Sequence, residues 1–330
     1  MSSKTAQDLV RGVVDESNST VERIASLRSA LCSDVDGQLL FGTAAPANDL
    51  SVRLCGECVA QALLPRLFAV LFAPATPFEC KKDIAVVLTA LLRVSTAAAA
   101  AAGDDSGQVF PVAEHIASAR ATLLDRLIDG YERSDTALVC GAVLRECVRH
   151  EPLAALVLAS ERVWTLFEHV QCAQLDVAAD ALSTLSELLT THREPVFAFL
   201  STHFARFFGA YRELLRSRNY VTRRQALKLL GDVIVHRRNF AVMSRYIGVK
   251  VELLLMMNLL RDKSRSIQFE AFHVFKVFVA NPNMNDDIRA VLRRNRALLV
   301  PFLADFRPDI DDDQFKRERA FLIKSLNAMV

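Results

Sequence analysis

A set of four apolar residues occurs four times in the chain at a constant spacing of 45 residues, and this repeat restricts the chain to few folds. Within each set the residues stand at i, i+3, i+6 and i+7, so they share one face of a helix. Repeats of about 40–47 residues are typical of HEAT and armadillo proteins, whose units stack to bury a continuous core. The four sets are Ala137, Cys140, Val143 and Leu144; Leu182, Leu185, Leu188 and Leu189; Leu227, Leu230, Val233 and Ile234; and Phe272, Phe275, Phe278 and Val279.

The composition and the pattern around the last two sets also favour a helical repeat. The 330 residues include only 11 Gly and 10 Pro, about half of their usual share, which favours long helices with short connections. Residues 218–283 read as three helices, and the middle one, at 251–260, is apolar nearly all round, so we expect it to be buried. We therefore predict an all-α, armadillo/HEAT-like solenoid of three-helix units of about 45 residues.

The pattern predicts a single solenoid domain over residues 1–330. Residues 1–48 are expected to form an N-terminal helix and a loop, and the alanine-rich stretch 95–108 to be a low-complexity insertion between repeats. A last amphipathic helix, at 314–330, follows an acidic linker and is expected to cap the final apolar face of the stack.

Cysteine usage and hydropathy bear on the compartment. The seven cysteines stand mostly in apolar surroundings, as buried thiols do in a reducing compartment. No N-terminal stretch resembles a signal peptide, and no run of 18 or more apolar residues could span a membrane. We expect a cytoplasmic protein that has no membrane contact.

Motifs that would carry catalysis are not found in the sequence. It contains neither HExxH nor a glycine-rich phosphate loop. Cys55 and Cys58 have the spacing of a metal or redox pair, but no second Cys or His pair follows, so we expect two core thiols. The acidic run at 309–313 lacks the Gly and Glu of a calcium loop. We predict no catalytic residues, no metal and no cofactor; a helical enzyme without a recognisable motif is the alternative.

One basic segment stands out although the net charge of the whole chain is only +2. Between Arg212 and Lys250 there are ten Lys and Arg against two Asp and Glu, and Tyr220, Arg224 and Lys228 form a row at i, i+4 and i+8. In armadillo-type repeats the third helix lines the concave groove. We interpret the row as a protein-docking surface; the alternatives are a solvated helix face and a nucleic-acid surface, for which Tyr220 and Phe240 offer few aromatics.

Several long segments resemble the calcium-binding protein 39 family, also called Mo twenty-five, whose members are armadillo-like scaffolds that activate protein kinases. The resemblance covers most of the chain and is weakest in the first 70 residues and the alanine-rich insertion. The segments are FECKKD (78–83), LRECVRHEPLA (144–154), NYVTRRQALKLLGD (219–232), RRNF (237–240) and MMNLLRDKSRSIQFEAFHVFKVFVANPN (256–283).

The resemblance implies a non-catalytic scaffold that acts as a monomer within a heteromeric complex. Its expected partners are a sterile-twenty-related pseudokinase adaptor, kinases of the liver kinase B type and germinal-centre kinases, and not nucleic acid or membrane. The family positions carried over to the partner-binding concave face are Tyr220, Arg224, Lys228, Arg237 and Phe240, together with Leu175, where the family has Phe. Binding to other protein cargo or to RNA is the alternative function.

The resemblance also implies a pocket for a Trp-Glu-Phe tail of the pseudokinase, with Met257 as its key methionine. Met256 and Met257 are adjacent, so their side chains point about 100° apart around a helix, and one can pack inward while the other lines a groove. Basic residues near them in the sequence could pair with a carboxylate of the incoming peptide; these are Arg261, Lys263, Arg265 and Arg294. The alternative is that Met257 is a core residue.

Overall fold

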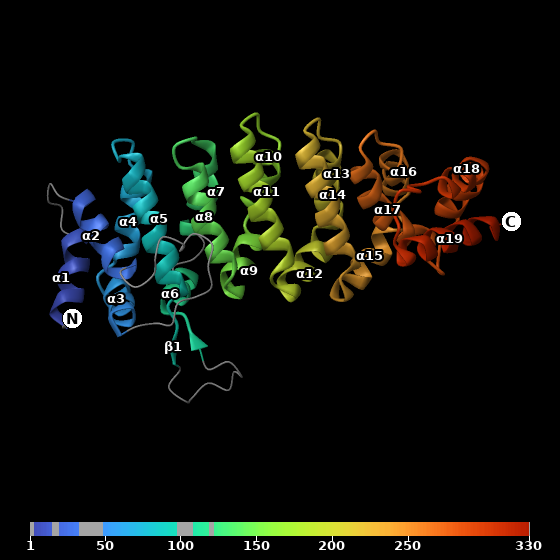
Figure 1. Ribbon diagram of the computed structural model, residues 1–330. Coiled ribbons are helices and arrows are strands. Elements are labelled where there is room, and N and C mark those ends of the chain that lie inside the picture. Colours follow the sequence, from blue (N-terminus) through green and yellow to red (C-terminus); the bar gives the residue numbers. More distant parts are fainter. Residues whose placement is uncertain (1–2, 15–19, 33–48, 98–107, 119–121, 330) are drawn as a thin grey trace. The chain divides into compact units, whose positions relative to one another are not determined.

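The computed structural model describes residues 3–14, 20–32, 49–97, 108–118 and 122–329, and these are predominantly helical (Figure 1). The chain divides into two compact units, residues 1–196 and 197–330. The all-α repeat architecture is confirmed, whereas the single domain over 1–330 stays a prediction. The predicted loop at 33–48 and most of the alanine-rich insertion lie outside the described residues.

In the first unit the longest helices pack side by side. Helix α5 lies against α2 and α8, and α8 lies in turn against α11. The described helices are α1 Ser3–Val14, α2 Thr20–Cys32, α3 Asp49–Ala60, α4 Leu63–Phe72, α5 Phe78–Arg93, α6 Pro111–Ser118, α7 Thr122–Asp129, the 3-10 turn η1 Gly130–Glu132, α8 Ala137–Val148, α9 Glu151–Ala159, α10 Val163–His169 and α11 Leu175–Thr190.

The second unit follows the same arrangement, with α13 beside α14, α14 beside α17, and α16 beside α17 (Figure 1). Helix α12, Arg193–Thr202, crosses the boundary between the units. The remaining elements are α13 Phe204–Leu215, α14 Tyr220–Val235, the 3-10 turn η2 Arg237–Asn239, α15 Phe240–Tyr246, α16 Lys250–Leu259, α17 Arg265–Val279, α18 Asp286–Ala304 and α19 Asp313–Asn327.

The repeating apolar sets lie on the third helix of successive repeats, namely α8, α11, α14 and α17. All sixteen side chains are buried, none of them more than 7% exposed. Helices α11, α14 and α17 begin at Leu175, Tyr220 and Arg265, which are 45 residues apart. Polar residues set two of these starts, because the side chain of Asn219 accepts hydrogen bonds from the first turn of α14 and Ser264 does the same for α17.

The last helix closes the second unit with an aromatic cluster. Helix α19 packs against both α17 and α18. Its Phe315 lies 4.8 Å from the ring centre of Phe272 on α17 and 6.3 Å from that of Phe306. Asp312 accepts hydrogen bonds from the first turn of α19, so this carboxylate of the acidic linker serves as an N-cap.

The structure corrects one sequence expectation and adds one feature that the sequence did not indicate. Helix α16 is not buried all round, because Val251 and Leu254 are each 39% exposed and Met257 is half-buried. The alanine-rich insertion begins and ends in a short antiparallel pair, β1 Thr96–Ala97 with β2 Gln108–Val109. Two-residue strands leave no periodic signal in a sequence, so nothing indicated this pair in advance.

Among the described residues, no single helix has both the length and the apolar character that a membrane span needs. The segments Ser51–Ala60 and Leu63–Phe72 meet these criteria only when taken together, and they are bent by 83°.

Candidate functional site

The row predicted on α14 lies on the solvent side of that helix. Tyr220 is 41% exposed, and Arg224 and Lys228 are also exposed. The opposite face of α14 carries Leu227 and Leu230, which are buried. We call Tyr220, Arg224 and Lys228 the α14 row; its position follows from the helical period, because residues four apart share a face.

Polar groups of the next repeat surround the α14 row. The hydroxyls of Ser264 and Ser266 lower the pKa of Tyr220, and the charge of Arg224 acts in the same direction. On α17, partial burial raises the pKa of Glu270, while the positive charges of Lys228 and Arg224 oppose this shift. The row is therefore a hydroxyl and two cations facing one carboxylate, which suits recognition of a polar, partly acidic protein surface.

Arg237 and Phe240 follow α14 directly and are both exposed, with Phe240 66% accessible. The turn that carries them is fixed by Asn239, whose side-chain amide donates to the carbonyl of Val233 at 2.8 Å. An exposed aromatic ring on a well-held turn is a typical anchor in protein interfaces.

Leu175 is the first residue of α11 and is 70% exposed. It belongs to the unit of residues 1–196, whereas the five other predicted face residues belong to 197–330. The side chain of Leu175 is thus apolar and exposed. That it forms one surface with the five other residues stays a prediction.

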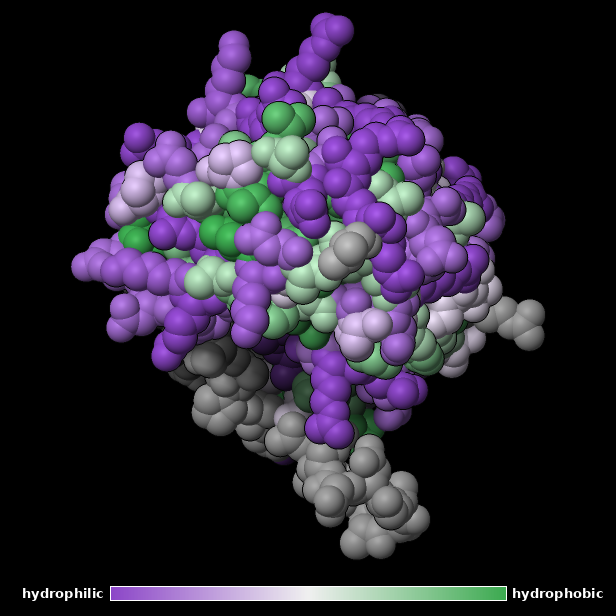
Figure 2. All heavy atoms as spheres, turned by 90° about the vertical axis from the view of Figure 1, so that its right-hand side faces the viewer, coloured by the Kyte–Doolittle hydropathy of each residue, from purple (hydrophilic) through white to green (hydrophobic). Residues whose placement is uncertain are grey.

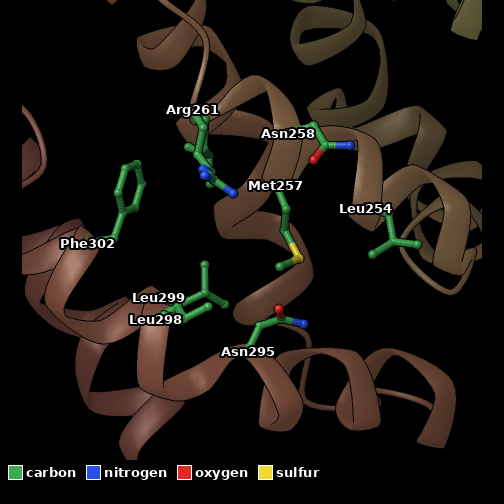
Figure 3. Close-up of a pocket in the computed structure, with 9 residues that line it drawn as sticks. Leu254, Met257, Asn258, Arg261, Asn295, Leu298, Leu299 and Phe302 are labelled. Carbon is green, nitrogen blue, oxygen red and sulfur yellow. The ribbon is translucent and has the colours of Figure 1, made fainter.

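A pocket of about 380 Å³ lies between α16 and α18, and Met257 is in its wall (Figure 3). Met256 is fully buried, so the two methionines divide between core and pocket. In Figure 3 the thioether of Met257 points toward Asn295, while Arg261 and Phe302 stand nearer the other end. We call this the tail pocket; it is lined by Leu254, Met257, Asn258, Leu260, Arg261, Asn295, Leu298, Leu299 and Phe302.

The tail pocket combines an apolar wall with a polar rim. Of the four cations expected near it, Arg261 lines the pocket, whereas Lys263, Arg265 and Arg294 do not. Arg265 lies 3.6 Å from Asp309 instead. A guanidinium at the edge of an apolar hollow fits a peptide that presents both an aromatic ring and a carboxylate.

The sequence pattern did not predict that α18 forms one wall of the tail pocket. Leu298 is 73% exposed, the largest exposure among the large apolar side chains described. Apolar side chains reach the surface among polar ones on the C-terminal side of the second unit (Figure 2). An apolar run, Leu298–Leu299, followed by Phe302 in an otherwise arginine-rich helix was the available signal.

The thiols that could suggest chemistry are part of the core. Cys55 and Cys58 are buried, and burial raises the pKa of Cys55 to about 12 and that of Cys58 further still. Such thiols stay protonated and are poor nucleophiles. Within the part of the chain that the structure describes, no group of three or more His, Cys, Asp or Glu is placed to hold a metal ion.

The fold and the exposed surfaces define a helical-repeat protein of the armadillo type. Two solved structures share the fold: a designed armadillo repeat protein in complex with a (KR)4 peptide has a TM-score of 0.51 at 10% identity, covering 83% of this chain and 99% of that one. A computationally designed armadillo repeat protein for modular peptide recognition has a TM-score of 0.50 at 11% identity, with the same coverage. At these identities the likeness shows the fold alone.

Sequence comparison then gives the family. The Mo25-like family model matches residues 2–330, and the chain belongs to that family. It is 39% identical to the Mo25-like protein of Schizosaccharomyces pombe, over 99% of this chain and 97% of that protein. It is 42% identical to the human calcium-binding protein 39-like, over 88% of this chain and 83% of that protein. The family and the fold together support a non-catalytic scaffold.

Proposed function

We propose that this chain is a scaffold that binds a sterile-twenty-related pseudokinase adaptor, or germinal-centre protein kinases directly, and stabilises the active conformation of the bound kinase fold. With the adaptor it would hold a kinase of the liver kinase B type in its active state. The observation that carries the proposal is the α14 row, in which an aromatic hydroxyl and two cations are held outward on a helix whose other face is core.

Activation needs no catalytic group on the scaffold. A kinase fold samples active and inactive arrangements of its αC helix, and a surface that contacts only the active one shifts the population toward it. Raising the active population from about 1% to about 99% requires a preference of roughly 5.5 kcal/mol. The α14 row, with Arg237 and Phe240, supplies charged and aromatic contacts of the kind that dominate interface energies.

The tail pocket provides a second attachment for the adaptor. Its apolar wall, with Met257 as a flexible and polarizable side chain, suits an aromatic residue. Arg261 at the rim suits the glutamate or the terminal carboxylate of a Trp-Glu-Phe tail. Two separate attachments would raise the overall affinity of the adaptor above that of either one.

The charge distribution favours one alternative function, binding of RNA or another acidic cargo. Residues 197–330 contain 24 Lys and Arg against 13 Asp and Glu, a net charge of +11, whereas residues 1–196 contain 16 against 25, a net charge of −9. Binding to phosphates would weaken steeply as salt is raised. A kinase contact with an apolar centre would weaken far less, so titration at two salt concentrations separates the two functions.

A kinase assay tests the proposed function. The purified chain is added to the kinase domain of a germinal-centre kinase, and phosphorylation of a peptide substrate is followed with and without it. We expect stimulation by the wild type, little stimulation by Arg224→Ala, and full stimulation by Arg293→Ala. Arg293 is an exposed arginine of α18 that belongs to neither surface, so this control makes the same change in charge.

A further inference from the structure

The turn between α16 and α17, residues 260–264, contacts both the tail pocket and the helix that carries the α14 row. Leu260 and Arg261 line the tail pocket. On the other side of the turn, Asp262 lies 3.2 Å from the guanidinium of Arg223, the neighbour of Arg224 on α14. One short turn therefore lies between the wall of the pocket and the helix that carries the α14 row.

The ion pair between Arg223 and Asp262 is held firmly at both ends. The side chains are only 22% and 18% exposed. Arg223 also donates to the carbonyl of Ser217 at 2.9 Å. Asp262 accepts from the backbone N–H of Ser264 at 2.8 Å, and its carbonyl accepts from the side chain of Gln268 at 2.8 Å. The pair joins the turn to α14, so the position of the turn and that of Arg223 depend on each other. Salt screens a half-buried ion pair only weakly, so this link persists at physiological ionic strength.

Comparison of two successive repeats shows that this link is an addition to the repeat pattern. In the earlier repeat, the hydroxyl of Ser217 accepts from the backbone N–H of Asn219 at 3.2 Å, as Asp262 does from Ser264. Arg223 and Gln268 each donate to the carbonyl six residues before them. Of these two, only Arg223 also reaches the turn of the next repeat. The equivalent positions are Ser217 and Asp262, Asn219 and Ser264, and Arg223 and Gln268.

We propose that Asp262 is a positioning residue that couples the tail pocket to the α14 row, so that a peptide bound in the pocket raises the affinity of the row for a protein partner. The inference rests on the proposed function of the two surfaces. A bound peptide contacts Leu260 and Arg261 and restricts the turn. Because the turn holds Arg223, the row then loses less conformational freedom when a partner docks.

Ser264 adds a second connection from the same turn. Its hydroxyl is near enough to Tyr220, the first residue of the row, to lower the pKa of that phenol, and it accepts from the backbone N–H of Ile267 at the start of α17. The same turn thus places a hydroxyl near one residue of the row and an ion-pair partner on the neighbour of another. The coupling is reciprocal, so a partner on the row must tighten peptide binding by the same factor.

Two variants isolate the ion pair. Asp262→Asn keeps a side-chain oxygen for the N–H of Ser264 but removes the charge that faces Arg223. Glu318→Gln is the matched control, because Glu318 pairs with Lys276 at 2.7 Å with similar exposures of 23% and 28%. Neither residue of that control pair lines the pocket or belongs to the row.

The experiment measures the affinity of a germinal-centre kinase domain by calorimetry, with and without a saturating peptide that ends in Trp-Glu-Phe. In the wild type and in Glu318→Gln we expect the peptide to tighten kinase binding about fivefold or more, the lower end of typical couplings. In Asp262→Asn we expect a ratio close to one, although the variant binds each probe separately.

The outcomes separate the coupling from the function on which it rests. A wild type that binds both probes with a ratio of one would overturn the coupling alone, as would an unchanged ratio in Asp262→Asn. A wild type that fails to bind either one of the probes would overturn the proposed function and the coupling with it.

Two further measurements guard against a misfolded variant. If Asp262→Asn melts well below the wild type, Arg223→Met removes the same pair from the other side and should also bring the ratio to one. In the wild type, amide hydrogen exchange at 219–224 should slow when the peptide is added alone. Unchanged exchange there would contradict the coupling without any use of a kinase.

Discussion

The carboxylate of Glu252 on α16 lies 2.5 Å from the guanidinium of Arg212 on α13, and the glutamate side chain is only 2% exposed. Burial raises the pKa of Glu252, and the opposing effect of Arg212 does not cancel the shift. This pair holds the pocket helix α16 against the helix that precedes α14. Because the carboxylate of Glu252 is buried, its protonation affects the stability of the unit that carries both surfaces.

The raised pKa of Glu252 predicts the sign of a pH effect. The folded chain holds this proton to a higher pH than the unfolded chain, so the contribution of Glu252 to stability is full below its unfolded pKa, about 4.3, and is lost as the pH rises through the folded value. The stability of the wild type minus that of Glu252→Gln should therefore fall as the pH rises from 4 to 7. Urea unfolding at several pH values measures this difference; a rise with pH would contradict the assignment.

The repeat register predicts the effect of removing a core ring. Phe275 on α17 is fully buried, so Phe275→Ala should lower the free energy of unfolding by about 3–5 kcal/mol through the cavity that it leaves. Denaturant unfolding measures the change. Phe321→Ala, on a ring of α19 that is 53% exposed, is the control and should cost much less. A wild-type midpoint for Phe275→Ala would show that the register is wrong.

The division of the two methionines predicts opposite phenotypes. Met257→Ala should abolish binding of a labelled Trp-Glu-Phe peptide with little loss of stability, because its side chain is only half-buried and lines the pocket. Met256→Ala, at a fully buried position, should lower stability by about 2–5 kcal/mol. Fluorescence anisotropy and thermal melting separate the two effects.

A neutral control on the same helix sharpens the test of the pocket. Val251 is 39% exposed and does not line the pocket, so Val251→Ala should leave peptide affinity unchanged. Equal peptide affinity of the wild type and Met257→Ala would place the peptide elsewhere.

The repeating part of the chain could be predicted from the sequence because its signal is periodic. Leu185, Leu230 and Phe275 recur at one spacing and are all buried, and the helical period places Tyr220, Arg224 and Lys228 outward. The same period predicts that the side chains of Met256 and Met257 point in different directions. In the structure Met256 is buried and Met257 lines the tail pocket. The apolar residues that recur in the sequence thus occupy equivalent buried positions in successive repeats of the fold.

The second wall of the pocket and the link through Asp262 could not be predicted in this way. Leu298 and Phe302 lie on α18, which carries none of the four repeating apolar sets, so no period relates them to Met257. The pair between Arg223 and Asp262 joins residues that are 39 positions apart, and it depends on the length of one side chain. The sequence predicted a buried α16 because composition does not show that one side of this helix borders the tail pocket.

The central claim is that the α14 row binds a kinase fold, and calorimetry of Arg224→Ala with a germinal-centre kinase domain tests it most directly. Arg224 is exposed and opposite the core, so we expect the melting temperature to stay at the wild-type value while binding weakens by about 2 kcal/mol or more, as for a central interface anchor. Arg293→Ala should bind as the wild type does. Unchanged affinity of Arg224→Ala, or a large fall in its melting temperature, would contradict the account.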